Sequence, residues 1–427
     1  MIIDFKTNKS ICGYPWIHSY LGCKYERKLC CISDDIIESE KTTTKEFWNS
    51  DYMKNIRLKM MNGDLIDECS VCYMNEKKDV ASLRQESMIS ITESTLKSMT
   101  EKTNSDGSLN DEPVYFDYRT IHCNLQCLSC GVVYSSKHIG LQKTMWGGNQ
   151  KIFISDKVFE KEMADEIIES LRNKVCTTIY WAGGEPMISP IHWAVLEEMI
   201  ELRKDKNYTN YIDEIGMHYN TNLTQLNWKS QSIPEILKFN QPSIQASLDG
   251  THETIEYTRD GCKWEDIKRN WIEYNKVLNK NNQMGIASVL TSPVIMDIDR
   301  WFDFYEPYNP MLFNHRQFTN LGGYPTFAAC FLDVRLFPQH IFDRIMDHAI
   351  YRFENCKLAN AGKTISILNS YKKEKKDNAE FLANPKMLEV VKKRTLYRDK
   401  FLITKRTYAE LLKIIDEESY DWYMSIK

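Results

Sequence analysis

The chain has 427 residues, a net charge of −4 from 55 Lys and Arg against 59 Asp and Glu, and a hydrophobic content of 42%. This composition is that of a globular protein and excludes a disordered, collagenous or coiled-coil chain. The small net charge gives no overall attraction to nucleic acid or to an anionic membrane. No apolar run reaches the roughly 18 residues of a membrane span, and the N-terminus lacks a signal-peptide pattern, so we expect a cytoplasmic protein.

The first predicted element is an amphipathic helix at 47–63, with Ser50 as its N-cap and Gly63 as its stop. A polar segment at 100–112 follows and reads as a linker. Strands then alternate with helices, which predicts parallel strands joined by right-handed crossovers, in an open sheet or a partial barrel. Beyond about residue 339 the pattern is helical and charged. We expect strands at 114–121, 177–181, 215–220, 243–248, 285–291 and 313–318, and helices at 156–172, 191–202, 264–278 and 299–305.

Thirteen cysteines are the unusual feature of the composition. An odd number in a long chain without a signal peptide favours metal binding over disulfides. Nine of them lie in the first third, in an early group from Cys12 to Cys72 and a triplet at 123–130. The other four stand singly, and we expect small buried hydrophobes there: Cys176, Cys262, Cys330 and Cys356.

The triplet follows the predicted strand at 114–121 directly and has the spacing Cys-x3-Cys-x2-Cys, at Cys123, Cys127 and Cys130. Three thiolates can hold three irons of a [4Fe–4S] cluster and leave the fourth iron open to another ligand, whereas four cysteines close the cluster. Structural zinc is the alternative, but it takes four ligands, and His122 is poorly placed to be the fourth. The spacing therefore favours an open iron–sulfur cluster.

The second informative segment is Gly183-Gly184-Glu185-Pro186, at the carboxyl edge of the next predicted strand. Parallel α/β folds bind their ligands at this edge. The two glycines allow a ligand to approach the backbone, and the carboxylate of Glu185 can accept hydrogen bonds from an ammonium group.

Together, the triplet and the Gly-Gly-Glu-Pro motif resemble the radical S-adenosylmethionine (SAM) superfamily, over residues 113–335. The resemblance implies a partial (β/α)6 TIM-like barrel in which the three cysteines hold a [4Fe–4S] cluster that binds SAM. The residues from Gly183 to Pro186 would then belong to the SAM site, with Gly183 to Glu185 at the methionine ammonium.

Further residues match the same resemblance after later strands. Thr221-Asn222 is similar to the Thr-Asn that ends a strand in many members. Ser247 and Arg259 are similar to the serine and arginine of a Ser-x-Asp-Gly and Arg-x-Gly pair, which makes them candidates for the ribose or carboxylate of SAM. Ser129 departs from the family, since many members place an aromatic residue there beside the adenine.

In the early group, Cys69-x2-Cys72 is a metal knuckle, and Cys12 with Cys30 or Cys31 would complete four ligands. We favour Cys30 over Cys31, and Cys23 is a spare candidate. The group resembles the SPASM/twitch module in its Cys-x2-Pro-Trp opening, its Cys-Cys pair, its Trp-Asn-Ser at 48–50 and its Cys-x2-Cys. This resemblance implies an auxiliary [4Fe–4S] cluster; structural zinc is the alternative. Such modules more often follow the SAM domain, and this one precedes it.

The sequence therefore predicts a twitch-like module at 1–99, a linker at 100–112, a radical SAM core at 113–335 and a helical region at 336–427. The resemblance implies reductive cleavage of SAM to a 5′-deoxyadenosyl radical, with a flavodoxin or ferredoxin as electron donor. The preferred substrate is a peptide or protein side chain that is oxidised or cross-linked. Dehydrogenation of a sugar alcohol or aminocyclitol is the alternative, and a non-catalytic zinc-stabilised interaction protein is the alternative of another class. No catalytic acid or base is identified.

Overall fold

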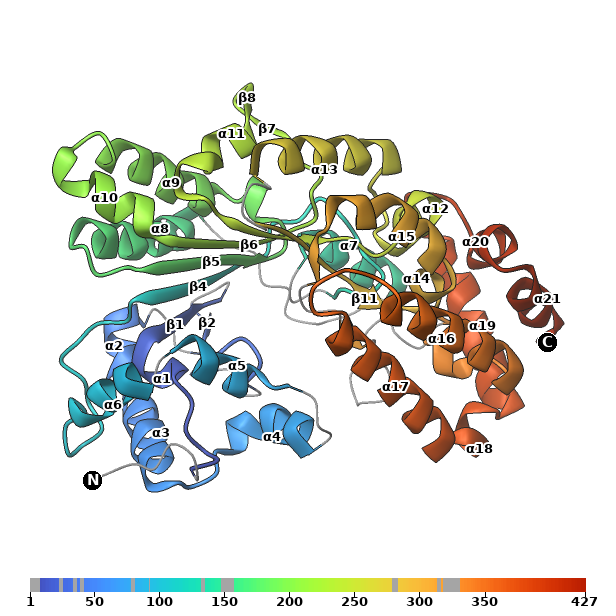
Figure 1. Ribbon diagram of the computed structural model, residues 1–427, viewed down its shortest axis with the longest axis horizontal. Coiled ribbons are helices and arrows are strands. Elements are labelled where there is room, and N and C mark those ends of the chain that lie inside the picture. The colour runs from blue at the N-terminus through green and yellow to red at the C-terminus, as the bar shows by residue number, and fades with distance from the viewer. Residues whose placement is uncertain are drawn as a thin grey trace. The chain divides into compact units, whose positions relative to one another are not determined.

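The computed structural model describes residues 8–22, 26–33, 37–38, 42–77, 81–91, 93–131, 135–146, 157–278, 283–312, 316–317 and 331–427. The chain divides into two compact units, Met1–Ile121 with Phe153–His218, and His122–Ile152 with Tyr219–Lys427 (Figure 1). Two of the cysteines considered above, Cys23 and Cys330, lie outside the described residues, as does most of the predicted strand at 313–318.

The main sheet has seven strands in the order β1-β4-β5-β6-β9-β10-β12. The pairs β1–β4, β4–β5, β9–β10 and β10–β12 are parallel. The predicted α/β class with a parallel sheet is therefore confirmed. The strands are β1 (His18–Leu21), β4 (Tyr115–Thr120), β5 (Thr178–Gly183), β6 (Gly216–Thr221), β9 (Ser243–Ser247), β10 (Met284–Ala287) and β12 (Met311–Leu312).

Strand β1 was not predicted from the sequence. It lies within the N-terminal cysteine-rich segment and pairs with β4, so that His18 is opposite Tyr115. Its four residues are all buried, and they carry no alternation of polar and apolar side chains that would indicate a strand. The cysteine-rich segment thus contributes a strand to the main sheet.

The first unit contains the cysteine-rich segment and the two long helices that follow β4 and β5 in the chain. Side chains on one face of these strands are buried: the ring of Trp181 on β5 contacts the rings of Tyr118 on β4 and His192 on α9. The helices of this unit are α1 (Tyr14–Ile17), α2 (Thr44–Trp48), α3 (Asp51–Asn62), α4 (Ser70–Lys77), α5 (Leu83–Ser90), α6 (Glu93–Glu101), α8 (Lys157–Arg172), α9 (Pro190–Leu202) and α10 (Lys206–Glu214).

The helix predicted at 47–63 is divided into α2 and α3 at Asn49-Ser50. Ser50 is extended, with φ −62° and ψ 158°, and its side chain accepts a hydrogen bond from the N–H of Met53, as the predicted N-cap requires. Gly63 ends α3 in the left-handed conformation, with φ +84°. The cap residue thus starts a new helix rather than lying within one.

The polar segment at 100–112 packs onto this break between the two helices. The side chain of Asn49 accepts a hydrogen bond from the N–H of Leu109 (2.9 Å) and donates one to its carbonyl (2.8 Å). Trp48 donates from Nε1 to the carbonyl of Asp111 (2.8 Å). The Trp-Asn-Ser motif therefore fixes the segment that follows α6.

The second unit contains the C-terminal half of the sheet and a helical region that begins at Gln339, as the sequence predicts. The helix predicted at 264–278 has the same bounds in the structure. The helices are α7 (Ser136–Trp146), α11 (Ile233–Leu237), α12 (His252–Thr258), α13 (Trp264–Leu278), α14 (Ser292–Met296), α15 (Ile298–Tyr305), α16 (Gln339–Glu354), α17 (Ala361–Asp377), α18 (Ala379–Leu382), α19 (Pro385–Asp399), α20 (Tyr408–Ile415) and α21 (Glu417–Ser425).

Three two-stranded pairs complete the described strands: β2 (Glu26–Arg27) with β3 (Ile37–Glu38), β7 (Asn227–Trp228) with β8 (Gln231–Ser232), and β11 (Val289–Leu290) with β13 (Arg316–Gln317). The strand predicted at 285–291 is thus divided into β10 and β11. Among the helices that the structure describes, none combines the length and the apolar character needed to cross a bilayer.

Candidate functional site

The three cysteines of the triplet share one loop, which follows β4. Cys127 is buried, and Cys123 and Cys130 are half-buried. Burial raises the pKa of the Cys127 thiol, and the neighbouring thiols of Cys123 and Cys130 raise it further, whereas Arg259 lowers it. Burial and Cys123 likewise raise the pKa of Cys130, to about 12. The structure therefore brings the three predicted ligands close enough together for their charges to interact. We call the segment that contains them, residues 122–131, the cysteine loop.

Arg259 lies against this loop. Its Nη1 is 3.7 Å from the Sγ of Cys127, and its Nη2 is 3.0 Å from Oδ2 of Asp249. The side chains of both charged residues are almost wholly buried. A buried cation favours the thiolate form of the sulfur beside it, which is the form that ligates metals. Arg259 thus lies beside the cysteine loop, and its guanidinium is also paired with the carboxylate of Asp249.

The start of α7 holds the cysteine loop from another side. The hydroxyl of Ser135 donates to the carbonyl of Leu125 (3.1 Å), and Nε2 of His138 lies 2.9 Å from the carbonyl oxygen of Cys127. Burial lowers the pKa of His138 to about 4, so at neutral pH the ring is uncharged and Nε2 carries the proton that it donates. Sequence reasoning missed both residues. The one available signal was a Ser-Ser-x-His segment at 135–138, which begins five positions after Cys130.

The predicted Thr221-Asn222 pair lies beside the same loop. Nδ2 of Asn222 donates to Oδ1 of Asn124 (2.9 Å), and its Oδ1 accepts from the N–H and the hydroxyl of Thr224 (3.0 and 2.7 Å). Thr221 is buried, and its hydroxyl accepts from the N–H of Leu223 (3.0 Å). Asn222 therefore orients the cysteine loop, whereas Thr221 shapes the turn after β6.

The two glycines of the second motif lie where β5 ends beside β4. Gly183 has φ +94°, and a Cβ atom there would lie 2.3 Å from the carbonyl oxygen of Thr120, the last residue of β4. The N–H of Gly184 donates to that same carbonyl (2.6 Å). Both the backbone conformation and the neighbouring strand thus require glycine at position 183.

Glu185 is fully buried, and its Oε1 accepts a hydrogen bond from the N–H of Met187 (3.0 Å). This contact caps the short 3₁₀ helix Pro186–Ile188, in which Pro186 is the first residue. The carboxyl group therefore has a role at the turn itself. Its predicted contact with an ammonium group stays a prediction.

Ser247 is the last residue of β9, half-buried, and opposite Ala287 of β10. The predicted core residues therefore follow or end β4, β5, β6 and β9, at the carboxyl ends of the strands. The Gly-Gly-Glu-Pro motif belongs to the first unit. The cysteine loop, Thr221, Asn222, Ser247 and Arg259 belong to the second.

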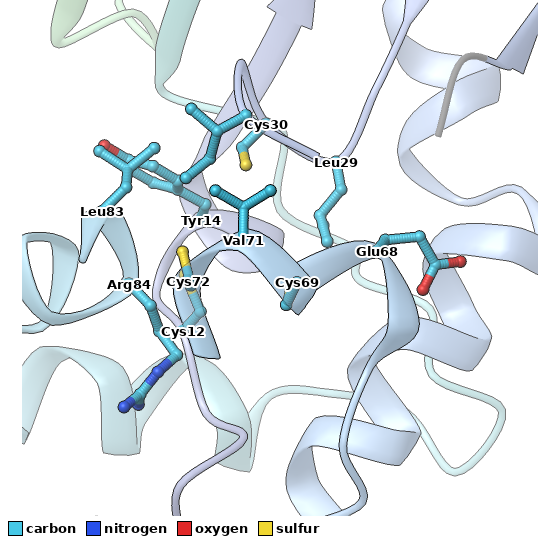
Figure 2. Close-up of a pocket in the computed structure, with 11 residues that line it drawn as sticks. Cys12, Tyr14, Leu29, Cys30, Glu68, Cys69, Val71, Cys72, Leu83 and Arg84 are labelled. Carbon is cyan, nitrogen blue, oxygen red and sulfur yellow. The ribbon is translucent and has the colours of Figure 1, made fainter. Parts of the chain in front are cut away.

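The early cysteines surround one cavity in the first unit (Figure 2). Cys12 precedes α1, Cys30 follows β2, Cys69 ends a 3₁₀ turn and Cys72 lies in α4; none is more than 9% exposed. The cavity is otherwise lined by Tyr14, Leu29, Ile32, Glu68, Val71, Leu83 and Arg84. The structure therefore brings all four preferred cysteines to one place.

The structure also distinguishes the two adjacent cysteines. Cys30 lines the cavity, whereas Cys31 is half-buried and is not among the lining residues. Cys30 is therefore the better fourth member of the cavity.

One cation borders this cavity. Arg84 holds Glu76 through two contacts, from Nε at 3.0 Å and from Nη2 at 2.6 Å, and donates from Nη1 to the carbonyl of Ile11 (3.1 Å). Burial raises the pKa of the Cys12 thiol, and a contact with the hydroxyl of Ser87 (3.3 Å) opposes this. A metal bound here would displace the protons of these thiols, because the thiolate is the form that ligates metals.

The residues present fit the implied groups by their chemistry, because sulfur ligands suit iron–sulfur clusters and zinc. Among the described residues, no three His, Cys, Asp or Glu side chains have the arrangement that a single metal ion requires. The cysteine loop offers three thiols and the cavity in the first unit offers four.

No protein-family model and no curated protein matches the chain. Among solved structures, the chain is similar to native anSMEcpe with bound AdoMet, at 18% identity over 58% of this chain and a TM-score of 0.38. It is also similar to Streptococcus suis SuiB bound to S-adenosylmethionine, at 14% identity over 76% of this chain and 66% of that chain, with a TM-score of 0.38. The chain spans 63% of the length of anSMEcpe, less than two thirds.

Proposed function

We propose that this protein is a radical SAM enzyme in which Cys123, Cys127 and Cys130 hold a [4Fe–4S] cluster that binds S-adenosylmethionine. The observation that carries the proposal is the cysteine loop itself: three thiols at the carboxyl end of β4, with the guanidinium of Arg259 3.7 Å from Cys127. When bound and reduced, this cluster supplies cleavage of SAM to a 5′-deoxyadenosyl radical, which takes hydrogen from the substrate.

The chain's own residues then have distinct roles. Arg259 offsets part of the negative charge that three thiolates bring into a buried loop. Gly183, Gly184, Glu185 and Pro186 form the turn that receives the methionine end of SAM, with Ser247 and Arg259 toward its ribose or carboxylate. Thr221 and Asn222 hold the turn after β6, from which Asn222 orients Asn124 in the loop.

We further propose that Cys12, Cys30, Cys69 and Cys72 hold an auxiliary [4Fe–4S] cluster. Their burial around one cavity supports this, as does a wall made largely of apolar side chains. The substrate we propose is a peptide or protein side chain that is oxidised or cross-linked, and this choice follows from the resemblance of the module to SPASM/twitch domains. A flavodoxin or ferredoxin would be the one-electron donor.

The experiment is anaerobic reconstitution of the full chain with iron and sulfide, followed by metal analysis and assay of 5′-deoxyadenosine with dithionite and SAM. We expect a brown protein absorbing near ~400 nm that holds about eight irons, four for each cluster. Changing Cys123, Cys127 and Cys130 to Ala should remove about four irons and all deoxyadenosine formation.

The matched control is Cys176→Ala, a buried cysteine that lines neither site. It should keep both the iron and the activity. A colourless protein with full zinc occupancy would contradict the proposal and favour a zinc-stabilised interaction protein. Activity toward a sugar alcohol or aminocyclitol, with none toward peptides, would contradict the substrate class alone.

A further inference from the structure

A short segment, from Tyr257 to Asp260, lies between the cysteine loop and the C-terminal region of the second unit. On the side of the loop it forms two backbone hydrogen bonds. The N–H of Gln126 donates to the carbonyl of Asp260 (3.0 Å), and the N–H of Leu128 donates to the carbonyl of Thr258 (2.8 Å). These two N–H groups belong to the residues on either side of Cys127, so the segment fixes the backbone at the buried thiol.

The side chain of Asp260 joins this segment to the C-terminal region. It is fully buried, and its Oδ2 accepts from Nε2 of Gln126 (2.6 Å) and from the N–H of Ile403 (2.8 Å). Its Oδ1 accepts from the N–H of Thr404 (2.8 Å). Nε2 of Gln126 also lies 3.1 Å from the carbonyl oxygen of Phe401. The carboxyl group of Asp260 thus joins the cysteine loop to residues 403 and 404, and Gln126 adds a contact with residue 401.

A second buried carboxyl group in the same region, that of Asp399, accepts a comparable set of hydrogen bonds, none of which comes from the cysteine loop. Asp399 accepts through Oδ1 from the hydroxyl of Tyr257 (3.0 Å) and from Nη2 of Arg398 (3.0 Å). Its Oδ2 accepts from the N–H of Tyr408 (2.8 Å). Asp399 is therefore a matched comparison for Asp260: it is similarly buried, it accepts a similar number of hydrogen bonds, and among the described residues it has no hydrogen bond to the cysteine loop.

We propose that Asp260 is a positioning residue, through which residues 401–404 hold the cysteine loop in the conformation that binds its cluster. The inference rests on the proposed function, which makes the loop a cluster site. Asp260 acts through Gln126 and the loop backbone rather than on a ligand sulfur. The C-terminal region is thereby part of the cluster-binding machinery, although it contributes no predicted ligand.

The physical reason is preorganisation. Three thiols must meet three irons at the same time, and a loop that is already ordered loses less conformational entropy on binding. The bond between Asp260 and Gln126 is buried, and those with Ile403 and Thr404 are part-buried. A buried donor that loses its acceptor also loses the compensation for its desolvation. Weakening this one carboxyl group should therefore loosen Gln126 and Leu128 together, on both sides of Cys127.

The test is Asp260→Asn in the full-length chain, because asparagine keeps the size of the side chain but presents an NH2 group to donors that need an acceptor. Hydrogen–deuterium exchange of peptides covering 122–131 is measured in the metal-free protein, and iron release to a chelator in the reconstituted one. We expect exchange in the loop to be faster on the order of tenfold, and iron release at the cysteine loop to be faster as well.

Asp399→Asn is the control. It should lower thermal stability to a similar extent and leave exchange at 122–131 close to that of the wild type. If Asp260→Asn does not fold, Gln126→Ala removes the same side-chain contact from the loop side and should produce the same faster exchange.

The proposal would be overturned if Asp260→Asn left both the exchange rate at 122–131 and the rate of iron release equal to those of the wild type. It would also be overturned if Asp399→Asn increased the exchange rate at 122–131 as much as Asp260→Asn does. The metal-free measurement separates this proposal from the proposed function. A wild-type chain that never binds iron would refute the proposed radical SAM function. Faster exchange at 122–131 in Asp260→Asn would still support the proposal that Asp260 holds the cysteine loop in place.

Discussion

The Nη1 atom of Arg259 lies 3.7 Å from the Sγ of Cys127, the central thiol of the cysteine loop. These residues are separated by 132 positions in the chain, and the same guanidinium holds the buried Asp249. The contact therefore couples the charge of the loop to an ion pair that the loop does not contain. A substitution of Arg259 or of Asp249 should therefore change the pKa of the Cys127 thiol.

We predict that replacing Arg259, the cation beside Cys127, raises the pKa of the Cys127 thiol. Arg259→Met alone would leave Asp249 buried without its cation, at a cost of about 3–5 kcal/mol, so the change is made in an Asp249→Asn background. Labelling of Cys127 by iodoacetamide in the metal-free protein, read by mass spectrometry, should then be slower than in Asp249→Asn by on the order of tenfold. Equal labelling rates in the two proteins would show that Arg259 does not act on the thiol.

We predict that Cys30, rather than Cys31, is the fourth member of the auxiliary site. Cys30 lines the cavity with the other three cysteines, whereas Cys31 is not among the residues that line it. Cys30→Ala should therefore lower the iron content of the reconstituted protein by about four, while Cys31→Ala keeps it. The two substitutions are adjacent and equal in size, so each is the control for the other. The reverse result would assign the ligand to Cys31.

Replacing both Cys69 and Cys72 by Ala should separate the two proposed clusters. The auxiliary iron should be lost, about four atoms, while reductive cleavage of SAM to 5′-deoxyadenosine continues without product formation. Iron analysis and chromatography of the nucleoside measure the two effects on one sample. Unchanged iron content and colour would show that this site does not hold an iron–sulfur cluster.

We predict that Gly183→Ala destabilises the first unit. The residue has φ +94°, and a Cβ atom would lie 2.3 Å from the carbonyl oxygen of Thr120. Strain and the displaced strand end together should lower the free energy of unfolding by about 2–4 kcal/mol, read as a lower unfolding temperature. Gly362→Ala in α17 is the control, because among the described residues no atom outside the surrounding turns of its own helix lies within 4 Å of an added Cβ, and it should be neutral or stabilising by up to about 1 kcal/mol. Equal effects of the two substitutions would contradict this prediction.

Features that depend on residues close together in the chain, such as helix bounds and helix caps, were predicted from the sequence. The bounds of α13 follow from its apolar periodicity, and Ser50 caps a helix as its residue type requires. The four early cysteines, which share a cavity, were grouped through the resemblance of their motifs to a known module. Contacts between distant positions leave no such pattern. The pairing of β1 with β4, the ion pair of Arg259 with Asp249, and the bonds of Asp260 to residues more than 140 positions away depend on the folded chain.

Loops show the same division between local and long-range effects. Gly183 was predicted to admit a ligand, and the structure gives it a second reason, since the end of β4 occupies the space of a side chain. Glycine marks a position where something comes close, but its presence does not say whether a strand or a ligand does so. The segment at 100–112 was predicted to be a linker from its polar composition, yet Asn49 binds it at Leu109.

We predict that the buried ring of His192 makes the stability of the protein depend on pH. His192 in α9 is fully buried against Trp181, and this burial lowers its pKa to about 3. In the unfolded chain the same ring has a pKa of about 6.5. Between these values the unfolded state binds the proton more readily, so stability falls as the pH falls from about 6.5 toward 3, and the full contribution is present above about 6.5.

The free energy of unfolding that is lost through His192 amounts to on the order of 4 kcal/mol when the pH has fallen to about 3. His192→Phe keeps an aromatic ring and removes the titration, so it should lose less stability than the wild type between pH 6.5 and pH 4.5. Urea unfolding at these two pH values, followed by tryptophan fluorescence, gives the difference. His348→Phe, at an exposed histidine of α16, is the matched control and should retain the wild-type pH dependence attributed to His192. If His192→Phe and the wild type lose stability equally, the buried ring of His192 is not the source of the acid sensitivity.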